Sequence, residues 1–195
     1  MANIYLQKNR EQRVYGGHPW VFRSDIEHVE GAAKDGAVVR VLSSRHKFLG
    51  MAVYNPRSQI SLRMLSRKDI SINSAFIHER VKRAVEYRRK FADLHSCRLI
   101  FAESDELPAV IADCFGDVIV LQVLCLGMEA FKQDIVDALV AEMHPQGIYE
   151  RNDVPVRELE GLEQHTGLLY GTVPDKVEMV ENGVRFLVDV KEGQK

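Results

Sequence analysis

The sequence predicts a mixed α/β protein of the α+β type, with strands and helices grouped in two successive domains. Apolar and polar residues alternate over residues 60–64, which is the pattern of a half-buried strand. Over residues 77–91, apolar residues recur at helical spacing. Near the C-terminal end, Asn182-Gly183 separates two alternating runs, which predicts a β-hairpin because both turn residues need a positive φ.

The first seventy residues are strand-rich. Residues 36–42 and 48–54 are two more strand candidates, and Gly16-Gly17-His18-Pro19 interrupts any regular element. A helix with a basic outer face follows, and Asn73 or Ser74 could cap its N-terminus. We therefore place the domain boundary near residue 72.

The second domain begins with short apolar strands at residues 98–102, 109–113 and 118–124, and Gly116-Asp117 predicts a turn between the last two. A second helix follows, and Pro145 and Gly147 end it. Its apolar face holds Phe131, Ile135, Ala138 and Leu139.

Charge is unevenly distributed along the chain. The 195 residues include 26 lysines and arginines and 28 aspartates and glutamates, a net charge of -2. Residues 1–92 hold 18 basic and 8 acidic residues (net +10), whereas residues 93–195 hold 8 and 20 (net -12). This asymmetry favours a polyanion-binding first half, although two ordinary domains of different charge would give the same count. A hydrophobic content of 46% excludes a disordered chain.

We expect a cytoplasmic protein without a membrane partner. The N-terminus lacks an apolar signal core, and the longest apolar stretch, residues 118–128, is shorter than the about 20 residues that a membrane-spanning helix needs. The three cysteines, Cys97, Cys114 and Cys125, are odd in number and form no CxxC pair, which predicts reduced thiols in the core.

Motifs for cofactors and metals are missing from the sequence. It contains no GxGxxG dinucleotide loop and no P-loop. The histidines are scattered, and His95 with Cys97 lacks a second pair of ligands, so no metal site is predicted.

Two polar segments could support chemistry. Residues 103–108 place three carboxylates between apolar strands, and residues 150–161 are rich in arginine and acidic groups. Paired carboxylates act as acids and bases only when packed together or against an apolar wall, so solvated or domain-docking loops are the commoner interpretation. The candidates for an interdomain or substrate cleft are Glu103, Asp105, Arg151, Asn152, Asp153 and Arg157.

Basic and aromatic residues are interleaved in the first half. Cations bind phosphates, and flat rings stack on unpaired bases. The commoner role for Trp20 is to pack in the core of a small domain. That role does not account for the surrounding cations, because a small domain gains little stability from so much like charge. The predicted RNA-binding residues are Arg10, Arg13, His18, Trp20, Arg23, Arg45, Lys47 and Arg63.

Residues 17–26, which read Gly17-His18-Pro19-Trp20-Val21-Phe22-Arg23-Ser24-Asp25-Ile26, resemble the opening of a PUA domain, a small RNA-binding β-barrel. Residues 147–162 and 181–195 resemble segments of the class I S-adenosylmethionine-dependent ribosomal RNA methyltransferases that make 5-methylcytosine in large-subunit RNA. The resemblance covers essentially the whole chain. Glu106 and Ala109 depart from it, since glycines are expected there, and no cysteine matches the catalytic cysteine motif.

The resemblance implies a PUA-like β-barrel at residues 1–72 and a small strand–helix–strand middle domain at residues 73–190. It implies that the Rossmann-like catalytic domain is absent from this chain, with residues 191–195 starting the linker or strand into it. S-adenosylmethionine would then be the cofactor of the parent enzyme and would not bind this chain, apart from contacts at its edge by Gln194 and Lys195. Ribosomal RNA is the implied partner, and the oligomeric state stays open, a homodimer included.

Three functions remain open at this point. The first is the RNA-binding N-terminal portion of a ribosomal RNA cytosine-5 methyltransferase, inactive by itself. The alternative is a stand-alone PUA-type RNA-binding module without enzymatic activity. The third is a small enzyme that uses Glu103 and Asp105, which needs a cavity joining them to Arg151 or Arg157.

Overall fold

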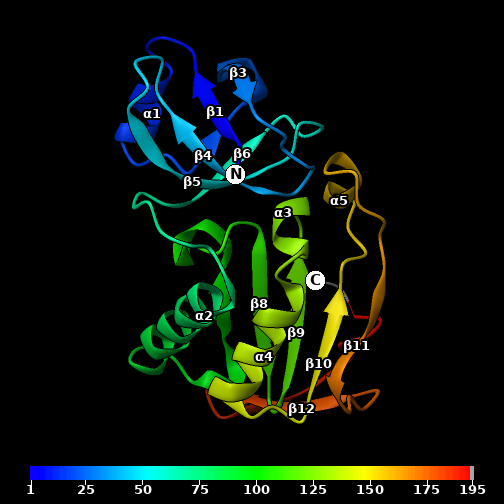
Figure 1. Ribbon diagram of the computed structural model, residues 1–195. Helices are drawn as coiled ribbons and strands as arrows, with labels where there is room; N and C mark the ends of the chain where they lie inside the picture. The colour runs from blue at the N-terminus through cyan, green and yellow to red at the C-terminus, as the bar shows by residue number, and fades with distance from the viewer. Residues whose placement is uncertain (194–195) are drawn as a thin grey trace.

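The computed structural model describes residues 1–193, which form two parts stacked end to end (Figure 1). The first part is a six-stranded sheet of order β2-β6-β5-β4-β1-β3, in which only β1 and β4 pair in parallel. Its elements are β1 (Asn3–Leu6), α1 (Glu11–Tyr15), β2 (Trp20–Val21), η1 (Arg23–Asp25), β3 (Ile26–Glu30), β4 (Val38–Leu42), β5 (Phe48–Tyr54) and β6 (Leu62–Ser66). We call residues 1–67 the barrel; Ile4, Leu6, Val41 and Leu62 lie fully buried in its core.

Three of the six barrel strands follow from the residue patterns. The predictions at residues 36–42 and 48–54 are confirmed as β4 and β5, whereas the third strand starts at Leu62 instead of residue 60. The backbone N–H of Asn55 donates to the carbonyl of Ser61 at 2.8 Å, which closes the segment between them as a loop. The alternating residues therefore pair with the sheet only from Leu62 onward, after this loop ends.

The second part is a five-stranded sheet of order β11-β10-β9-β8-β7. Its strands are β7 (Arg98–Phe101), β8 (Val110–Phe115), β9 (Val118–Val123), β10 (Gly147–Arg151) and β11 (Thr166–Gly171). Strands β9 and β10 pair in parallel, and the other neighbours are antiparallel. The sequence did not predict β11, because four of its six residues are exposed and no apolar face marks it.

This sheet corrects the predicted fold class. The prediction of a small middle domain, with the Rossmann-like catalytic domain absent from the chain, is wrong. The sheet has five strands, and a crossover through α3 (Leu126–Glu129) and α4 (Lys132–Met143) joins the parallel strands β9 and β10. That strand–helix–strand connection is the unit from which Rossmann-like sheets are built. Local patterns predict strands and helices but not the order in which distant strands pair, so the mixed topology was missed.

Two helices, α2 (Ser74–Arg89) and α4, cover one face of this sheet (Figure 1). The predicted cap is confirmed, since the Asn73 side chain accepts a hydrogen bond from the backbone N–H of Phe76. Ile77, Val81 and Val85 on α2 are fully buried against the sheet. The predicted stripe ran on to Phe91, but the helix ends at Arg89. Within residues 1–193, no helix is long and apolar enough to cross a membrane.

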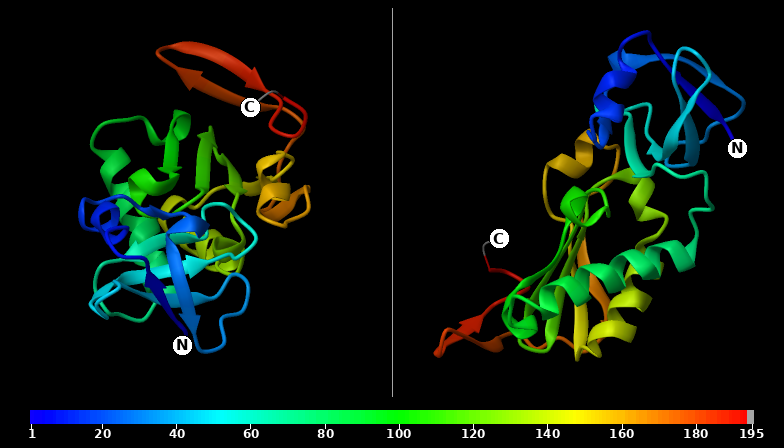
Figure 2. Two further views of the ribbon diagram at one scale, coloured as in Figure 1. Left: turned by 90° about the horizontal axis from the view of Figure 1, so that it is seen from above. Right: turned by 90° about the vertical axis from the view of Figure 1, so that its left-hand side faces the viewer.

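The predicted C-terminal hairpin is confirmed as β12 (Val177–Glu181) and β13 (Val184–Val188). Its turn residues, Asn182 and Gly183, have φ values of 50° and 79°, as the turn requires. The hairpin projects from the side of the sheet opposite α2 (Figure 2), where Val177 packs with Val118 and Val120 of β9. The prediction that Gln194 and Lys195 touch a cofactor lies outside the described residues.

Candidate functional site

Five of the eight predicted RNA-binding residues have exposed side chains on the barrel. They are Arg10, Arg13, Arg23, Arg45 and Lys47. The guanidinium of Arg13 lies 5.0 Å from the centre of the Phe22 ring, and Arg45 lines an open hollow of about 500 Å³ together with Lys8. Exposed cations beside an aromatic ring are the groups that bind a phosphate backbone.

The other three residues, His18, Trp20 and Arg63, are not exposed, and two of them, Trp20 and Arg63, lie at the junction with the second part. The indole N–H of Trp20 donates to Oε1 of Glu103 at 2.7 Å, and Nη1 of Arg63 donates to the same oxygen at 2.9 Å. Nδ1 of His18 accepts the backbone N–H of Trp20 at 3.1 Å, which fixes the loop before β2. All three side chains have protein partners, and those of Trp20 and Arg63 form contacts across the junction.

Arg63 also reaches Glu160, which follows the short helix α5 (Val156–Leu159). Nη2 of Arg63 lies 3.2 Å from Oε1 of Glu160, and both residues are buried, at 8% and 3% exposure. Asn55 and Ser58 of the barrel donate to the same carboxylate at 2.8 and 2.7 Å. Glu160 carries no sequence signature of this role, because burial of a surface-type carboxylate is visible only in the folded chain.

The acidic loop is held by arginines of α2. Asp105, at the end of the turn η3 (Ala102–Asp105), accepts two hydrogen bonds from Arg88 at 2.7 and 2.6 Å. Glu106 forms ion pairs with Arg80 and Arg83. Carboxylates engaged in this way fix the loop against α2 and the barrel.

The geometry does not support the small-enzyme hypothesis. The cavity that Glu103 lines and the cavity that Arg151 lines share no residue. Arg157 is fully buried elsewhere, where it pairs with Glu129 at 2.9 Å and donates to the carbonyl of Val123. The acidic loop and the two arginines therefore do not line one reaction site.

Residues 150–161 form contacts that connect neighbouring strands of the second sheet. Nη1 of Arg151 donates to the carbonyl of Val190 at 2.9 Å, and its guanidinium also pairs with Asp153. The Asn152 side chain accepts the backbone N–H of Val123 at 2.9 Å. These contacts hold β9, β10 and the segment after the hairpin in one arrangement.

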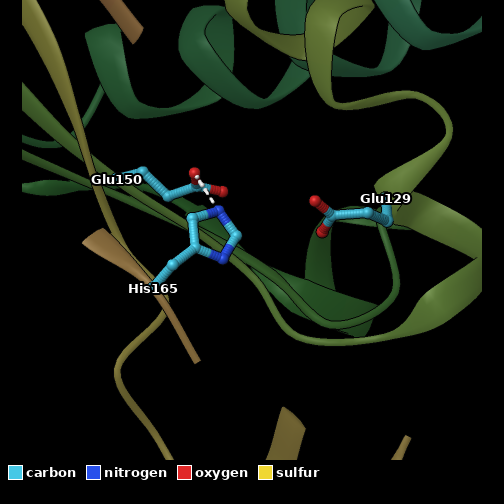
Figure 3. Close-up of side chains that lie close together, drawn as sticks. All are labelled: Glu129, Glu150 and His165. Carbon is cyan, nitrogen blue, oxygen red and sulfur yellow. Dashed lines mark ion pairs between the residues drawn. The ribbon is translucent and has the colours of Figure 1, made fainter. Parts of the chain in front are cut away.

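Glu129, Glu150 and His165 bring three metal-type donors together (Figure 3). His165 Nε2 lies 2.7 Å from Glu150, and Lys132 lies 2.5 Å from Glu129 and 3.0 Å from Glu150. Burial alone would raise the pKa of Glu129, but hydrogen bonds from Lys132 and Arg157 hold that pKa below its ordinary value. Two cations already neutralise the two carboxylates, so we assign no metal to this cluster.

The cysteines are free, and Cys114 and Cys125 are buried as predicted, whereas Cys97 is half-buried. Burial raises the pKa of both Cys114 and Cys125 to about 12. The reactive form of cysteine is the thiolate, so these two residues are poor nucleophiles at neutral pH.

The crossover after β9 is where a Rossmann-like sheet would hold a cofactor, outside the carboxyl end of the strand. Here the barrel fills that place. A Cβ built on Gly127 of α3 would overlap the side chain of Val53 in β5, so α3 and the barrel are in close contact. The described residues at this turn do not fit S-adenosylmethionine, and we derive no step through it.

The barrel fold and its exposed cations define a PUA-like domain, and residues 4–67 match the family model for a PUA-like domain. Over its full length the chain is 40% identical to ribosomal RNA large subunit methyltransferase I of Pseudoalteromonas atlantica and 42% identical to that of Vibrio vulnificus. The chain spans about half the length of these curated relatives, 50% in both cases.

Two solved structures share the fold over the whole chain. A candidate SAM-dependent methyltransferase from Streptococcus mutans superposes with a TM-score of 0.79 at 21% identity, covering 99% of this chain and 50% of its own. A candidate methyltransferase complexed with SAH gives 0.81 at 21% identity, covering 100% of this chain and 49% of its own. These matches complete the correction of the fold class, because both β-sheets recur together in methyltransferase chains.

Proposed function

We propose that this chain is the RNA-binding part of a ribosomal RNA large subunit methyltransferase and that its barrel docks the RNA. The full-length similarity to proteins of that name supports the proposal most directly. The exposed arginines and Lys47 of the barrel supply the phosphate contacts that docking needs. Such an enzyme would act in the cytoplasm, where free thiols stay reduced.

The finer assignment is methyl transfer from S-adenosylmethionine to carbon 5 of a cytosine, and it rests on the sequence resemblance. In this proposal residues 1–72 grip the RNA and residues 73–190 form a middle domain. Glu103, held between Trp20 and Arg63, keeps the two in a fixed orientation. The described residues would then bind the RNA without catalysing methyl transfer themselves. Cys114 and Cys125 are protonated thiols and do not act as the nucleophile.

RNA binding is tested with a fluorescently labelled fragment of 23S-type rRNA. Arg13→Glu and Lys47→Glu should each weaken binding, and should each lower the salt dependence by about one phosphate contact. Arg10→Glu should act in the same direction, although Arg10 also lies 3.4 Å from Asp25. Arg185→Glu is the matched control, since Arg185 is also exposed and lies on the hairpin, at the end of the second part away from the barrel (Figure 1). Binding that is insensitive to salt, or equally weakened by the control, contradicts the docking role.

Cofactor binding is tested separately by the melting temperature of the chain with added S-adenosylmethionine. A ligand that binds the folded state must raise its stability. We predict no shift and no methyl transfer by residues 1–195 alone. A saturable rise in melting temperature would overturn that prediction without affecting the RNA-docking role.

A further inference from the structure

Two aromatic rings stand exposed at the C-terminal end of α2. Tyr87 is 58% exposed and Phe91 is 73% exposed, and their ring centres lie 5.1 Å apart. Neither ring packs into the core that α2 forms through Ile77, Val81 and Val85. Together they form a small aromatic platform on the surface of the second part.

Cations surround this platform. The guanidinium of Arg88 lies 5.3 Å from the centre of the Tyr87 ring. Tyr87 lines a hollow of about 590 Å³ with Arg83 and Lys90, and the turn η3 forms the other wall. Within residues 1–193, Lys90 is in no ion pair, so its charge is available to a ligand. Arg83 and Arg88 pair with Glu106 and Asp105, so Lys90 is the cation of this hollow that a ligand phosphate can engage beside the rings.

The hollow is continuous with the barrel. A second groove of about 610 Å³ shares Arg83 and Glu106 with it and extends to Gly17 and Arg67 of the barrel and to Lys68, which follows the barrel. Arg67 and Lys68 are exposed, and within the described chain neither is in an ion pair. The two hollows, whose walls hold carboxylates as well as cations, thus extend from the loop before Trp20, across the junction, to Tyr87.

We propose that unpaired nucleotides of the bound RNA follow these two hollows and stack two bases on Tyr87 and Phe91. This inference rests on the proposed function, because the barrel must first dock the RNA. Phosphates would contact Arg67, Lys68 and Lys90, while the rings hold bases without regard to sequence. Stacking needs splayed bases, so the platform selects single-stranded over duplex segments.

The test uses two RNAs with the same stem, one of which has a single-stranded tail containing 2-aminopurine. The Tyr87→Ala/Phe91→Ala variant should bind the tailed RNA about ten-fold more weakly than wild type and the blunt stem equally well. The 2-aminopurine signal that reports stacking should be lost as well. The salt dependence should stay unchanged, because no cation is removed.

Matched variants complete the experiment. Phe91→Tyr keeps a flat ring and should retain wild-type affinity. Tyr170→Ala removes a 41% exposed ring from β11 and should have no effect. Equal melting temperatures of all variants exclude misfolding as the cause.

The failures are distinguishable. If wild type binds RNA and Arg13→Glu weakens it, but loss of both rings changes nothing, the platform is refuted and the docking role stands. If wild type binds neither RNA, both proposals fail. If loss of the rings abolishes self-association of the chain and leaves RNA binding intact, the platform is a protein contact and the inference is overturned.

Discussion

Nη1 of Arg63 lies 2.9 Å from Oε1 of Glu103, and this ion pair joins β6 of the barrel to the turn η3 beside the second sheet. Because the same guanidinium also pairs with Glu160, one buried arginine holds two carboxylates of the second part. The orientation of the barrel depends on this residue.

Arg63→Ala should lower the free energy of unfolding by about 3 kcal/mol, because removing one partner leaves buried charge uncompensated. Urea unfolding measures this. Arg57→Ala is the control, since its ion pair with Asp35 is exposed and should contribute less than about 1 kcal/mol. Equal effects of the two substitutions would show that the buried pairs add nothing to the junction.

The contact between Gly127 and Val53 is the second determinant of the junction. Gly127→Ala should destabilise the protein by about 1–3 kcal/mol, because its Cβ overlaps the Val53 side chain. Gly167→Ala, with nothing within 4 Å, is the control. Combining Gly127→Ala with Val53→Ala should cost less than the sum of the two single changes. Strict additivity in urea unfolding would argue against a direct contact.

Ala109 has a φ of 58°, the left-handed conformation that the glycine expected there would adopt without strain. Ala109→Val should destabilise the protein by about 2 kcal/mol or more, because a β-branched residue fits this conformation poorly. Ala109→Gly should change stability by less than about 1 kcal/mol, since relieved strain offsets the lost methyl group. Ala75→Val on the exposed face of α2 serves as the control. An Ala109→Val variant as stable as wild type would exclude strain at this position.

The lowered pKa of Glu129 predicts acid sensitivity. Its pKa is lower in the folded than in the unfolded chain, so its contribution to stability is complete above about pH 4.3 and is lost as pH falls through the folded value. Glu129→Gln should therefore flatten the fall in stability below about pH 4.3, measured by urea midpoints against pH. Glu181→Gln, an exposed carboxylate, should leave the profile as in wild type. If the stability of Glu129→Gln fell as steeply with decreasing pH as that of wild type, groups other than Glu129 would cause the acid sensitivity.

The exposure of the predicted RNA-binding residues was anticipated only in part. Exposed Arg13 and Lys47 lie where an interleaved basic segment suggested, whereas Trp20 and Arg63 share the carboxylate of Glu103. A basic residue in a strand looks the same in sequence whether it faces solvent or a neighbouring domain. The platform of Tyr87 and Phe91 was missed for the same reason, since Phe91 fits the apolar stripe of α2 by spacing alone.

The sequence by itself determined three of the six barrel strands, the capped start of α2, the Asn182-Gly183 hairpin and the basic first half. Each depends on residues close in the chain, through side-chain alternation, capping or turn chemistry. The tertiary structure decided the parallel pairing of β9 with β10, the burial of Arg63 and Glu160, and the exposure of Phe91. These features arise from contacts between residues far apart in sequence. The free energy of such contacts leaves no pattern in the neighbouring residues of the chain.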